Sequence, residues 1–252
     1  MSGKMVTLEG WYILHDFRRF DQAQWRQLSD AAQEEIQSEF SEILESFERV
    51  NSNRSGAFGL YQILGHQADY LFLNLRTDLH ELSKTEQRLQ KSRLFDFLVP
   101  TYSYVSVVEL SNYVSSESAT SPEVQALLDA RLKPALPDLK HVCFYPMSKS
   151  RAVGANWYLE PLEERRRMMK EHGSIGRTYA GKVLQMIGGS IGFDDWEWGV
   201  TLFSDDPLHF KHLVTEMRFD EASARFAEFG TFYLGNRISL ADLNAGFKIS
   251  KV

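Results

Sequence analysis

The first half of the chain shows two stretches of helical periodicity set between stretches of strand-like alternation. In the longer helical stretch, apolar side chains recur every three or four residues, which indicates one buried face. The pattern predicts a strand, a long helix, two strands joined by a turn, a second helix and a last strand, at 11–17, 21–49, 59–64, 70–76, 79–98 and 102–110. This β-α-β-β-α-β order is that of a ferredoxin-like unit.

The second half repeats the order, with predicted elements at 141–147, 161–172, 181–187, 197–203, 207–217 and 229–234. Gly173 is a plausible helix stop, and Gly188-Gly189 a plausible hairpin turn. Residues 61–65 also share letters with 184–188, and the repeat makes Gln185 a strand residue on the face of Val183 and Ile187. We therefore expect an α+β fold. Its predicted parts are an N-terminal ferredoxin-like unit (1–113), a connecting segment (114–139) and a C-terminal unit (140–252).

Two ferredoxin-like units that pair their sheets form a barrel-like core with helices outside, and such cores can enclose a small-molecule site. The 252 residues, 43% of them hydrophobic, suffice for a large core. The net charge is −6 with both signs interspersed, which disfavours a nucleic-acid partner. No apolar run reaches 18 residues and no secretion signal is recognisable, so we expect no membrane span and a cytoplasmic location. The single Cys143 excludes an internal disulfide.

Candidate chemistry lies on the strand that opens the second half. Side-chain alternation places Tyr145, Met147 and Lys149 on one face. A buried phenol beside an ammonium suits a site that binds a carboxylate and passes an electron or a proton. The alternative is an amphipathic edge strand whose lysine reaches the solvent.

His172 is the candidate metal ligand. It lies on the helix side of Met168 and Met169, where an imidazole could bind a haem iron; the alternative is a packed or surface histidine. No carboxylate stands three or four residues away, which predicts a weak bond to iron. Candidates for binding carboxylates, each of which could instead be a surface polar group, are Arg131, Lys149, Arg218 and Ser223.

Several segments resemble the coproheme decarboxylases of Gram-positive bacteria, which belong to the chlorite dismutase-like superfamily. They are 10–12, 15–18, 144–149, 168–177, 189–203 and 218–223. The resemblance covers nearly the whole chain and implies a homopentamer of the two-unit barrel fold. It implies hydrogen-peroxide-dependent decarboxylation of coproheme (Fe-coproporphyrin III), the last step of coproporphyrin-dependent haem biosynthesis. Two propionates become vinyls through a three-propionate intermediate, and the product is haem b.

The resemblance also implies roles for individual residues. His172 matches the proximal iron ligand, and Gln185 matches the distal glutamine on the other side of the ring. Tyr145 matches the tyrosine that becomes a radical, and Lys149 matches the lysine needed for loss of the second propionate. Further matches, to residues around the propionates, are Arg131, Met147, Arg218, Ser223 and Tyr113.

Three other functions remain open. Chlorite dismutation resembles proteins with a distal arginine, whereas Gln185 carries no positive charge. A non-catalytic haem carrier would need His172 but not Tyr145. An interaction module without a ligand would leave these residues unexplained. A transient contact with the ferrochelatase of the pathway is a further expectation from the resemblance.

Overall fold

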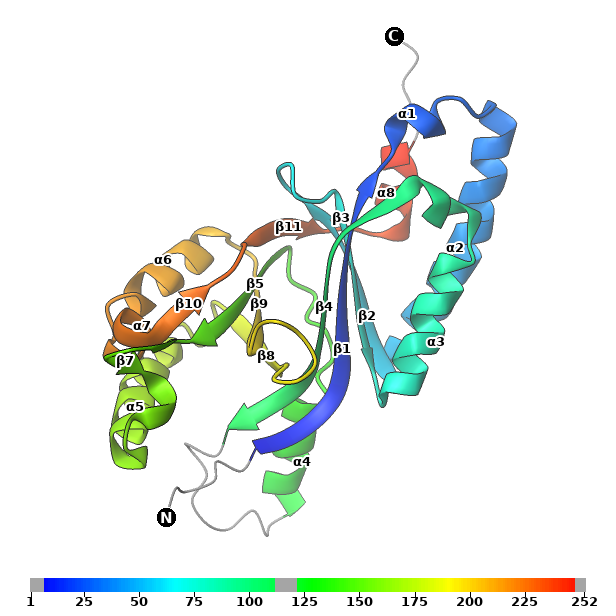
Figure 1. Ribbon diagram of the computed structural model, residues 1–252. Helices are drawn as coiled ribbons and strands as arrows, with labels where there is room; N and C mark the ends of the chain where they lie inside the picture. Colours follow the sequence, from blue (N-terminus) through cyan, green and yellow to red (C-terminus); the bar gives the residue numbers. More distant parts are fainter. Residues whose placement is uncertain (1–6, 112–121, 248–252) are drawn as a thin grey trace. The chain divides into compact units, whose positions relative to one another are not determined.

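The structure is a computed structural model that describes residues 7–111 and 122–247 (Figure 1). The chain forms two compact units, neither of which is continuous in sequence. We call them the 11–105 unit, which comprises Trp11–Val105 and the described residues from Gly235 on, and the 106–234 unit, which comprises the described residues of Ser106–Leu234 and those up to Gly10. No helix within the described ranges has the length and apolar character needed to cross a membrane.

The 11–105 unit is an antiparallel sheet with helices. Its elements are β1 (Thr7–Phe20), α1 (Gln22–Trp25), α2 (Asp30–Asn53), β2 (Gly56–Ile63), β3 (Tyr70–Arg76), α3 (Leu79–Gln90), the 3₁₀ helix η1 (Arg93–Phe97), β4 (Leu98–Ser111), the end of β11 (Tyr233–Arg237) and α8 (Leu240–Phe247). In this sheet β3 pairs with β1 and β2, and β2 pairs with residues 235–237 of β11.

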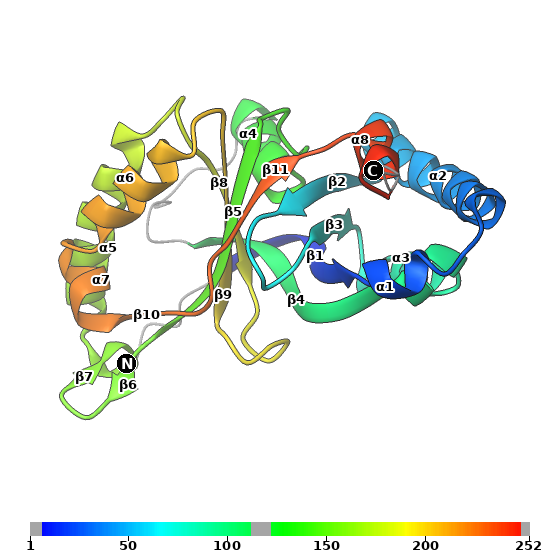
Figure 2. The same cartoon turned by 90° about the horizontal axis from the view of Figure 1, so that it is seen from above.

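The core of this unit is rich in aromatic side chains. The apolar face of α2, as the periodicity predicts, is buried and packs on β2, with Phe40 against Phe72 and Phe95. Helix α8 lies beside α2 (Figure 2), and the indole Nε1 of Trp25 donates to the carbonyl of Phe247 at 3.1 Å. The last described helix therefore completes the core that the first helices begin.

Two predicted helices of this unit are shorter than expected. The predicted 21–49 helix is interrupted, because two capping residues each start a helix of their own: Asp21 accepts from the amide of Gln24, and Ser29 accepts from the amide of Ala32. The predicted 79–98 helix ends at Gln90 and is followed by η1. Both differences follow from local polar groups that compete with the helical hydrogen bonds.

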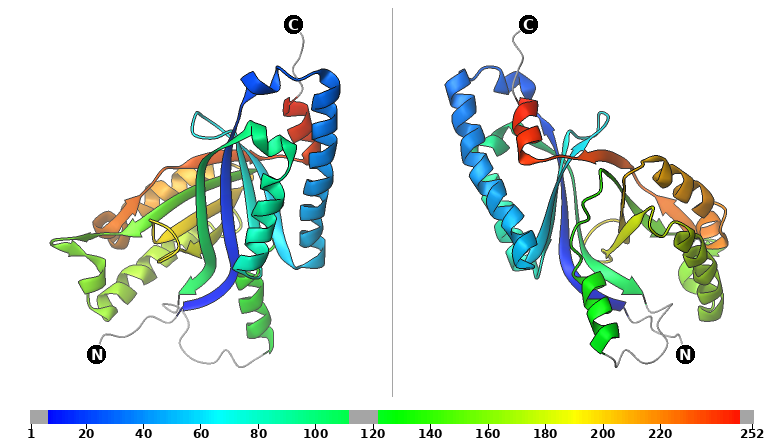
Figure 3. Two further views of the ribbon diagram at one scale, coloured as in Figure 1. Left: turned by 45° about the vertical axis from the view of Figure 1, so that its right-hand side comes forward. Right: turned by 180° about the vertical axis from the view of Figure 1, so that it is seen from behind.

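The 106–234 unit contains the second half of the predicted pattern. Its elements are α4 (Pro122–Leu132), β5 (His141–Lys149), β6 (Arg151–Ala152), β7 (Ala155–Asn156), the 3₁₀ helix η2 (Trp157–Leu159), α5 (Leu162–Thr178), β8 (Leu184–Gly189), β9 (Trp198–Ser204), α6 (Leu208–Met217), α7 (Glu221–Phe226) and β10 (Ala227–Phe229). The antiparallel strand order is β10-β5-β9-β8, followed by the end of β4. Helices α5, α6 and α7 pack together (Figure 3).

Three local predictions in this unit are wrong. Helix α5 does not stop at Gly173 but continues to Thr178, since a single glycine costs a helix only about 1 kcal/mol. Gly188 and Gly189 are not a turn; they pair with Gly199 and Trp198 in the β8–β9 ladder. The predicted strand 229–234 is divided between β10 and β11.

The α+β class and the order of the main elements in both halves are confirmed. The compact units cut across the predicted repeats 1–113 and 140–252, because residues 235–247 pack with the 11–105 unit. A repeat is defined by element order and a unit by contacts, so the bounds of the repeats and of the 114–139 connection stay a prediction.

Candidate functional site

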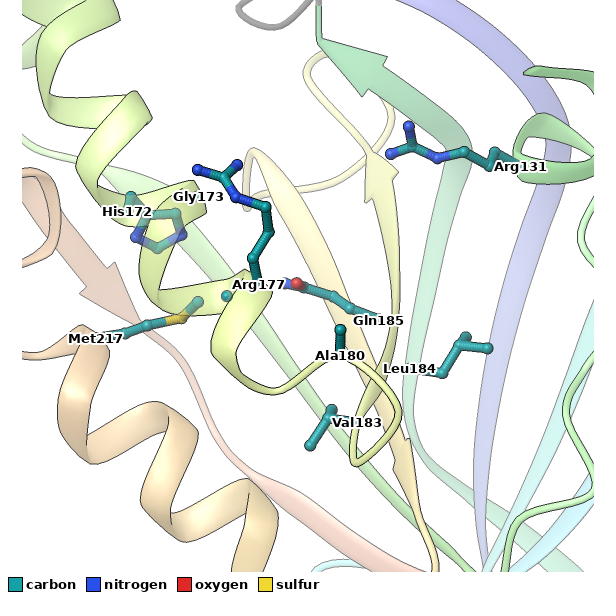
Figure 4. A pocket seen from close by; sticks show the side chains of 10 residues that line it. Arg131, His172, Gly173, Arg177, Ala180, Val183, Leu184, Gln185 and Met217 are labelled. Atoms are coloured by element: carbon teal, nitrogen blue, oxygen red, sulfur yellow. The ribbon is translucent and has the colours of Figure 1, made fainter. Parts of the chain in front are cut away.

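A cavity of about 560 Å³ lies in the 106–234 unit between α5 and β8 (Figure 4). This volume is within the range of about 300–1,000 Å³ that is usual for small-molecule sites. The residues that line it are Arg131, His172, Gly173, Gly176, Arg177, Ala180, Val183, Leu184, Gln185 and Met217. The cavity thus brings together three of the residues predicted from the sequence, His172, Gln185 and Arg131.

His172 is held by a carboxylate that the sequence did not reveal. Its Nδ1 donates to Oδ2 of Asp220 at 2.9 Å. Asp220 caps α7, 48 positions further along the chain. The expected weakness of His172 as a ligand rested on the absence of a carboxylate three or four residues away in sequence; the structure brings one from a distant position, which removes the basis for that expectation. A hydrogen bond at Nδ1 fixes the ring tautomer and leaves the lone pair of Nε2 available for a metal.

Asp220 is itself firmly positioned. Its side chain is buried, and it accepts hydrogen bonds from the amide of Ser223 at 2.9 Å and from the Ser223 hydroxyl at 3.0 Å. Burial alone would raise the pKa of this carboxyl, but the hydrogen bonds from His172 and Ser223 outweigh it and hold the pKa below its ordinary value. An ionised Asp220 is therefore a fixed acceptor for His172.

The cavity face of α5 is flat beside His172. Gly173 and Gly176 bring no side chains, and Ala180, in the turn that follows the helix, brings only a methyl group. The glycines therefore leave space close to the helix backbone, and the side chain of Arg177 occupies the part of it next to Gly173. The continuation of α5 beyond Gly173, which the sequence analysis missed, is what places these residues and Arg177 on the cavity wall.

Gln185 and Arg131 lie across the cavity from His172 (Figure 4). Gln185 is on β8, paired with Leu202 of β9, so its predicted place on a strand is confirmed. Arg131 comes from the last turn of α4. Neither Arg131 nor Arg177 forms an ion pair or hydrogen bond with a described residue. Two uncompensated guanidinium groups on one small cavity favour an anionic ligand.

Tyr145 lies on β5 but does not line this cavity. Its ring stacks on Phe232 with the ring centroids 4.4 Å apart, and only 4% of the residue is exposed. Burial raises the pKa of the phenol, the neighbouring Cys143 adds to the rise and Arg218 partly opposes it. The guanidinium of Arg218 lies 4.1 Å from the ring centroid of Phe229, and Met147 packs on the same apolar cluster.

Lys149 is also buried, with 7% of the residue exposed. Its Nζ donates to the carbonyl of Ala222 at 2.9 Å and lies 4.9 Å from the centroid of the Trp157 ring. Burial lowers the pKa of Lys149 to about 8, against the opposing effects of Asp220 and Glu197. The carboxylate of Glu197 accepts from the amide of Lys149 at 2.8 Å.

The N-terminal end of α7 connects these two groups of residues. Asp220 binds His172 on the cavity, and the carbonyl of Ala222 binds Lys149 on β5. Ser223, another predicted residue, belongs to the same network through Asp220. Tyr113 lies outside the described residues. The structure therefore places His172, Gln185 and Arg131 on the cavity. Ser223 lies on α7, and Lys149 lies on β5 with its ammonium bound to α7.

A family comparison identifies the class of protein. The family model described as chlorite dismutase matches residues 30–238. The chain therefore belongs to the chlorite dismutase family.

Solved structures agree with this assignment. The chain is similar to a heme-binding protein from Thermus thermophilus, with 44% identity over 98% of both chains and a TM-score of 0.92. It is also similar in fold to variants of the chlorite dismutase from Candidatus Nitrospira defluvii. One has 19% identity over 95% of each chain and a TM-score of 0.76. Another has 20% identity over 97% of this chain and 98% of that chain, with a TM-score of 0.77. The predicted fold is thus confirmed.

Proposed function

We propose that the protein is a hydrogen-peroxide-dependent coproheme decarboxylase that converts two propionates of Fe-coproporphyrin III to vinyls and so produces haem b. The observation that carries the proposal is the pairing, on one cavity, of His172 with the unpaired guanidinium of Arg131. The ligand that fits best has a metal for the imidazole and carboxylates for the cations. Coproheme carries both, and its iron supplies the redox chemistry with peroxide.

In this proposal the cavity residues hold and orient the substrate. His172 binds the iron through Nε2 while Asp220 holds Nδ1, and Gln185 lies on the opposite side of the ring. Arg131, Arg218 and the Ser223 hydroxyl bind propionates in this proposal, and Met147 and Tyr113 are assigned to the surroundings of the propionates on the resemblance alone. An acidic chain gains local affinity for a tetra-anion by such a concentration of donors.

Tyr145 and Lys149 are the catalytic residues of the proposal. Burial keeps the phenol of Tyr145 protonated, so its one-electron oxidation by the substrate's iron and peroxide would also release a proton and give a neutral radical. The radical would take a hydrogen atom from a propionate, and the vinyl would form as CO2 leaves and the remaining electron passes to the oxidised iron. Lys149, with a pKa of about 8, can hold or deliver a proton near neutral pH. One N–H of its ammonium donates to the carbonyl of Ala222, and the two others are available for a propionate.

One other function is favoured by a specific observation. A non-catalytic haem carrier agrees with the 44% identical relative, which is described as a heme-binding protein. Chlorite dismutation is less well supported, because the amide of Gln185 offers an anionic oxidant no fixed charge. The carrier needs His172 and the cations, but it gives Tyr145 and Lys149 no task.

The test is the product distribution after stepwise addition of peroxide to protein loaded with ferric coproporphyrin III, measured by mass. The wild-type protein should show two successive losses of a carboxyl group. Tyr145→Phe, which keeps the ring volume, should largely stop both losses. Lys149→Ala should accumulate the three-propionate intermediate. Tyr158→Phe, at an exposed tyrosine on η2, is the matched control and should behave as wild type.

Two results would contradict the proposal. No carboxyl loss in the wild-type protein, with coproheme bound through His172, would leave the carrier as the better function. Full conversion to haem b by Tyr145→Phe would show that Tyr145 is not the radical-forming residue and only contributes to packing.

Assembly and location are part of the proposal. We infer a homopentamer in the cytoplasm that makes a transient contact with the ferrochelatase of the pathway. Sedimentation of the purified protein tests the oligomer, since a pentamer of 29.0 kDa chains is readily distinguished from a monomer or dimer.

A further inference from the structure

Arg177 occupies a wall of the cavity that the sequence analysis did not consider. It lies in the last turn of α5, one turn beyond Gly173, and its side chain extends into the cavity between His172 and Gln185 (Figure 4). Its Nη1 lies 3.5 Å from the position that a Cβ on Gly173 would take. The guanidinium thus lies over the flat, glycine-lined part of the helix, next to the imidazole of His172.

The pairing of Arg177 differs from that of Arg166 and Arg167 on the same helix; it resembles that of Arg165, whose Nε has no hydrogen-bond partner among the described residues but which does not line the cavity. Arg166 donates to Glu163 at 3.0 Å, and Arg167 donates to Glu164 at 3.0 Å and also to Glu221. Arg177 forms no ion pair or hydrogen bond with a described residue. Its charge is therefore available to a ligand, whereas the charges of Arg166 and Arg167 are compensated within the protein.

We propose that Arg177 binds a carboxylate of the ring ligand and helps to determine the preference of the cavity for polycarboxylate porphyrins. The inference rests on the proposed function, since it assigns a further contact to the same ligand. Arg177 lies on the His172 side of the cavity and Arg131 on the opposite side. Two carboxylates of one ring can therefore be bound from two sides, which fixes the rotation of the ring in its plane. Guanidinium suits this role because it binds a carboxylate with two parallel hydrogen bonds.

A purely structural role for Arg177 has a distinct physical basis. A cation in the last turn of a helix interacts favourably with the helix dipole. That interaction acts on helix stability and does not depend on the charge of a ligand. The two roles are therefore separated by comparing ligands of the same shape with and without carboxylates.

The experiment is a fluorescence titration with iron-free coproporphyrin III, which has four carboxylates, and with its tetraamide, which has the same ring and no charge. Arg177→Gln should weaken binding of the acid about tenfold, as expected for loss of one charge-assisted pair, and should change binding of the amide less than twofold. Arg177→Lys should retain part of the preference, because it keeps the charge and loses the two-pronged geometry. Arg166→Gln, on the same helix, should change neither titration.

The outcomes are distinguishable. The inference about Arg177 is overturned if Arg177→Gln binds the acid as tightly as wild type does, or if its affinities for the acid and the amide fall equally. In that case weaker binding of the acid by Arg131→Gln would still show that the porphyrin occupies this cavity. If the wild-type protein binds neither ring, or binds both equally, the proposed function fails as well.

Discussion

Helices α2 and α5 hold corresponding places in the two halves of the chain but have opposite surroundings. The inner face of α2 is covered, with Phe40 and Leu44 almost completely buried against the sheet of the 11–105 unit. Helix α5 has one completely buried side chain, Met168, and makes its main contacts with α6 and α7. Where α2 has apolar side chains, α5 has His172, two glycines and Arg177 around a cavity.

The difference between α2 and α5 shows that one of two corresponding helix faces is used for packing and the other for a cavity. In one unit the helix face is used for packing, which stabilises the fold. In the other, the same kind of face is left sparse, and a hydrogen-bond network around Asp220 connects α5 with α7. The following predictions test whether packing and binding are separated in this way.

The largest expected effect is on stability and belongs to α2. Leu44→Ala removes a side chain that is 1% exposed, and it should lower the free energy of unfolding by ~2–5 kcal/mol. Ile175→Ala, at a half-buried position of α5, should cost about 1 kcal/mol because part of its surface is already in water. Urea denaturation of both variants measures this, and equal losses would break the comparison.

The second effect is a pH dependence that originates in the 11–105 unit. Burial lowers the pKa of His15 to about 3, and a backbone hydrogen bond at Tyr104 only partly opposes it. Between pH 6.5 and 3 the unfolded chain binds a proton that the folded chain does not, so stability falls as the pH drops. His15→Leu should remove ~1.4 kcal/mol of this loss per pH unit. Unfolding curves at about pH 7, 6, 5 and 4 test it; parallel pH profiles would contradict it.

The third effect is on the polar network of the 106–234 unit. Asp220→Asn removes the charge that accepts from His172 and Ser223, and should cost ~1–3 kcal/mol of stability. It should also alter the absorption spectrum of bound ferric coproporphyrin, because the imidazole loses its anionic partner. Ser223→Ala, which removes only the hydroxyl, is the control with the smaller expected change. An unchanged spectrum would show that Asp220 has no influence on the iron bound by His172.

The smallest stability effect should come from a pair of matching glutamines. Gln62 on β2 and Gln185 on β8 are both exposed and occupy equivalent places in the two halves. Replacing either with Ala should change stability by less than ~0.5 kcal/mol. Only Gln185→Ala should change the binding of peroxide or small anions to the porphyrin-loaded protein. A similar change in Gln62→Ala would remove the distinction between the two units.

The sequence predicts those parts of the fold that depend on neighbours along the chain. Alternation located β3 at residues 70–76 and the repeat placed Gln185 on a strand, because each signal lies within one element. The break before α2 was also readable: Asp21 and Ser29 are both good capping residues, and two caps in one predicted helix indicate two helices. The length of α5 was not, since one glycine costs a helix only about 1 kcal/mol and Gly173 alone does not show whether the helix ends or continues.

The contacts that define the site could not be predicted in the same way. Asp220 and His172 are far apart in sequence, and no periodicity connects a cap of α7 with a side chain of α5. Lys149 was expected beside Tyr145, but whether its ammonium turns to α7 depends on the carbonyl of Ala222. Arg177 was not considered, because it lies beyond the predicted end of the helix, and the continuation of α5 places it on the cavity.

The contact between Trp25 and Phe247 has a consequence for synthesis of the protein. The indole at the start of the chain donates to a carbonyl more than two hundred residues later, and Leu243 and Phe247 fill the same aromatic core. A growing chain on the ribosome therefore cannot close this core until the last described helix has emerged. For most of translation the apolar face of α2 lacks that cover, so the nascent chain presents a ready binding site for chaperones.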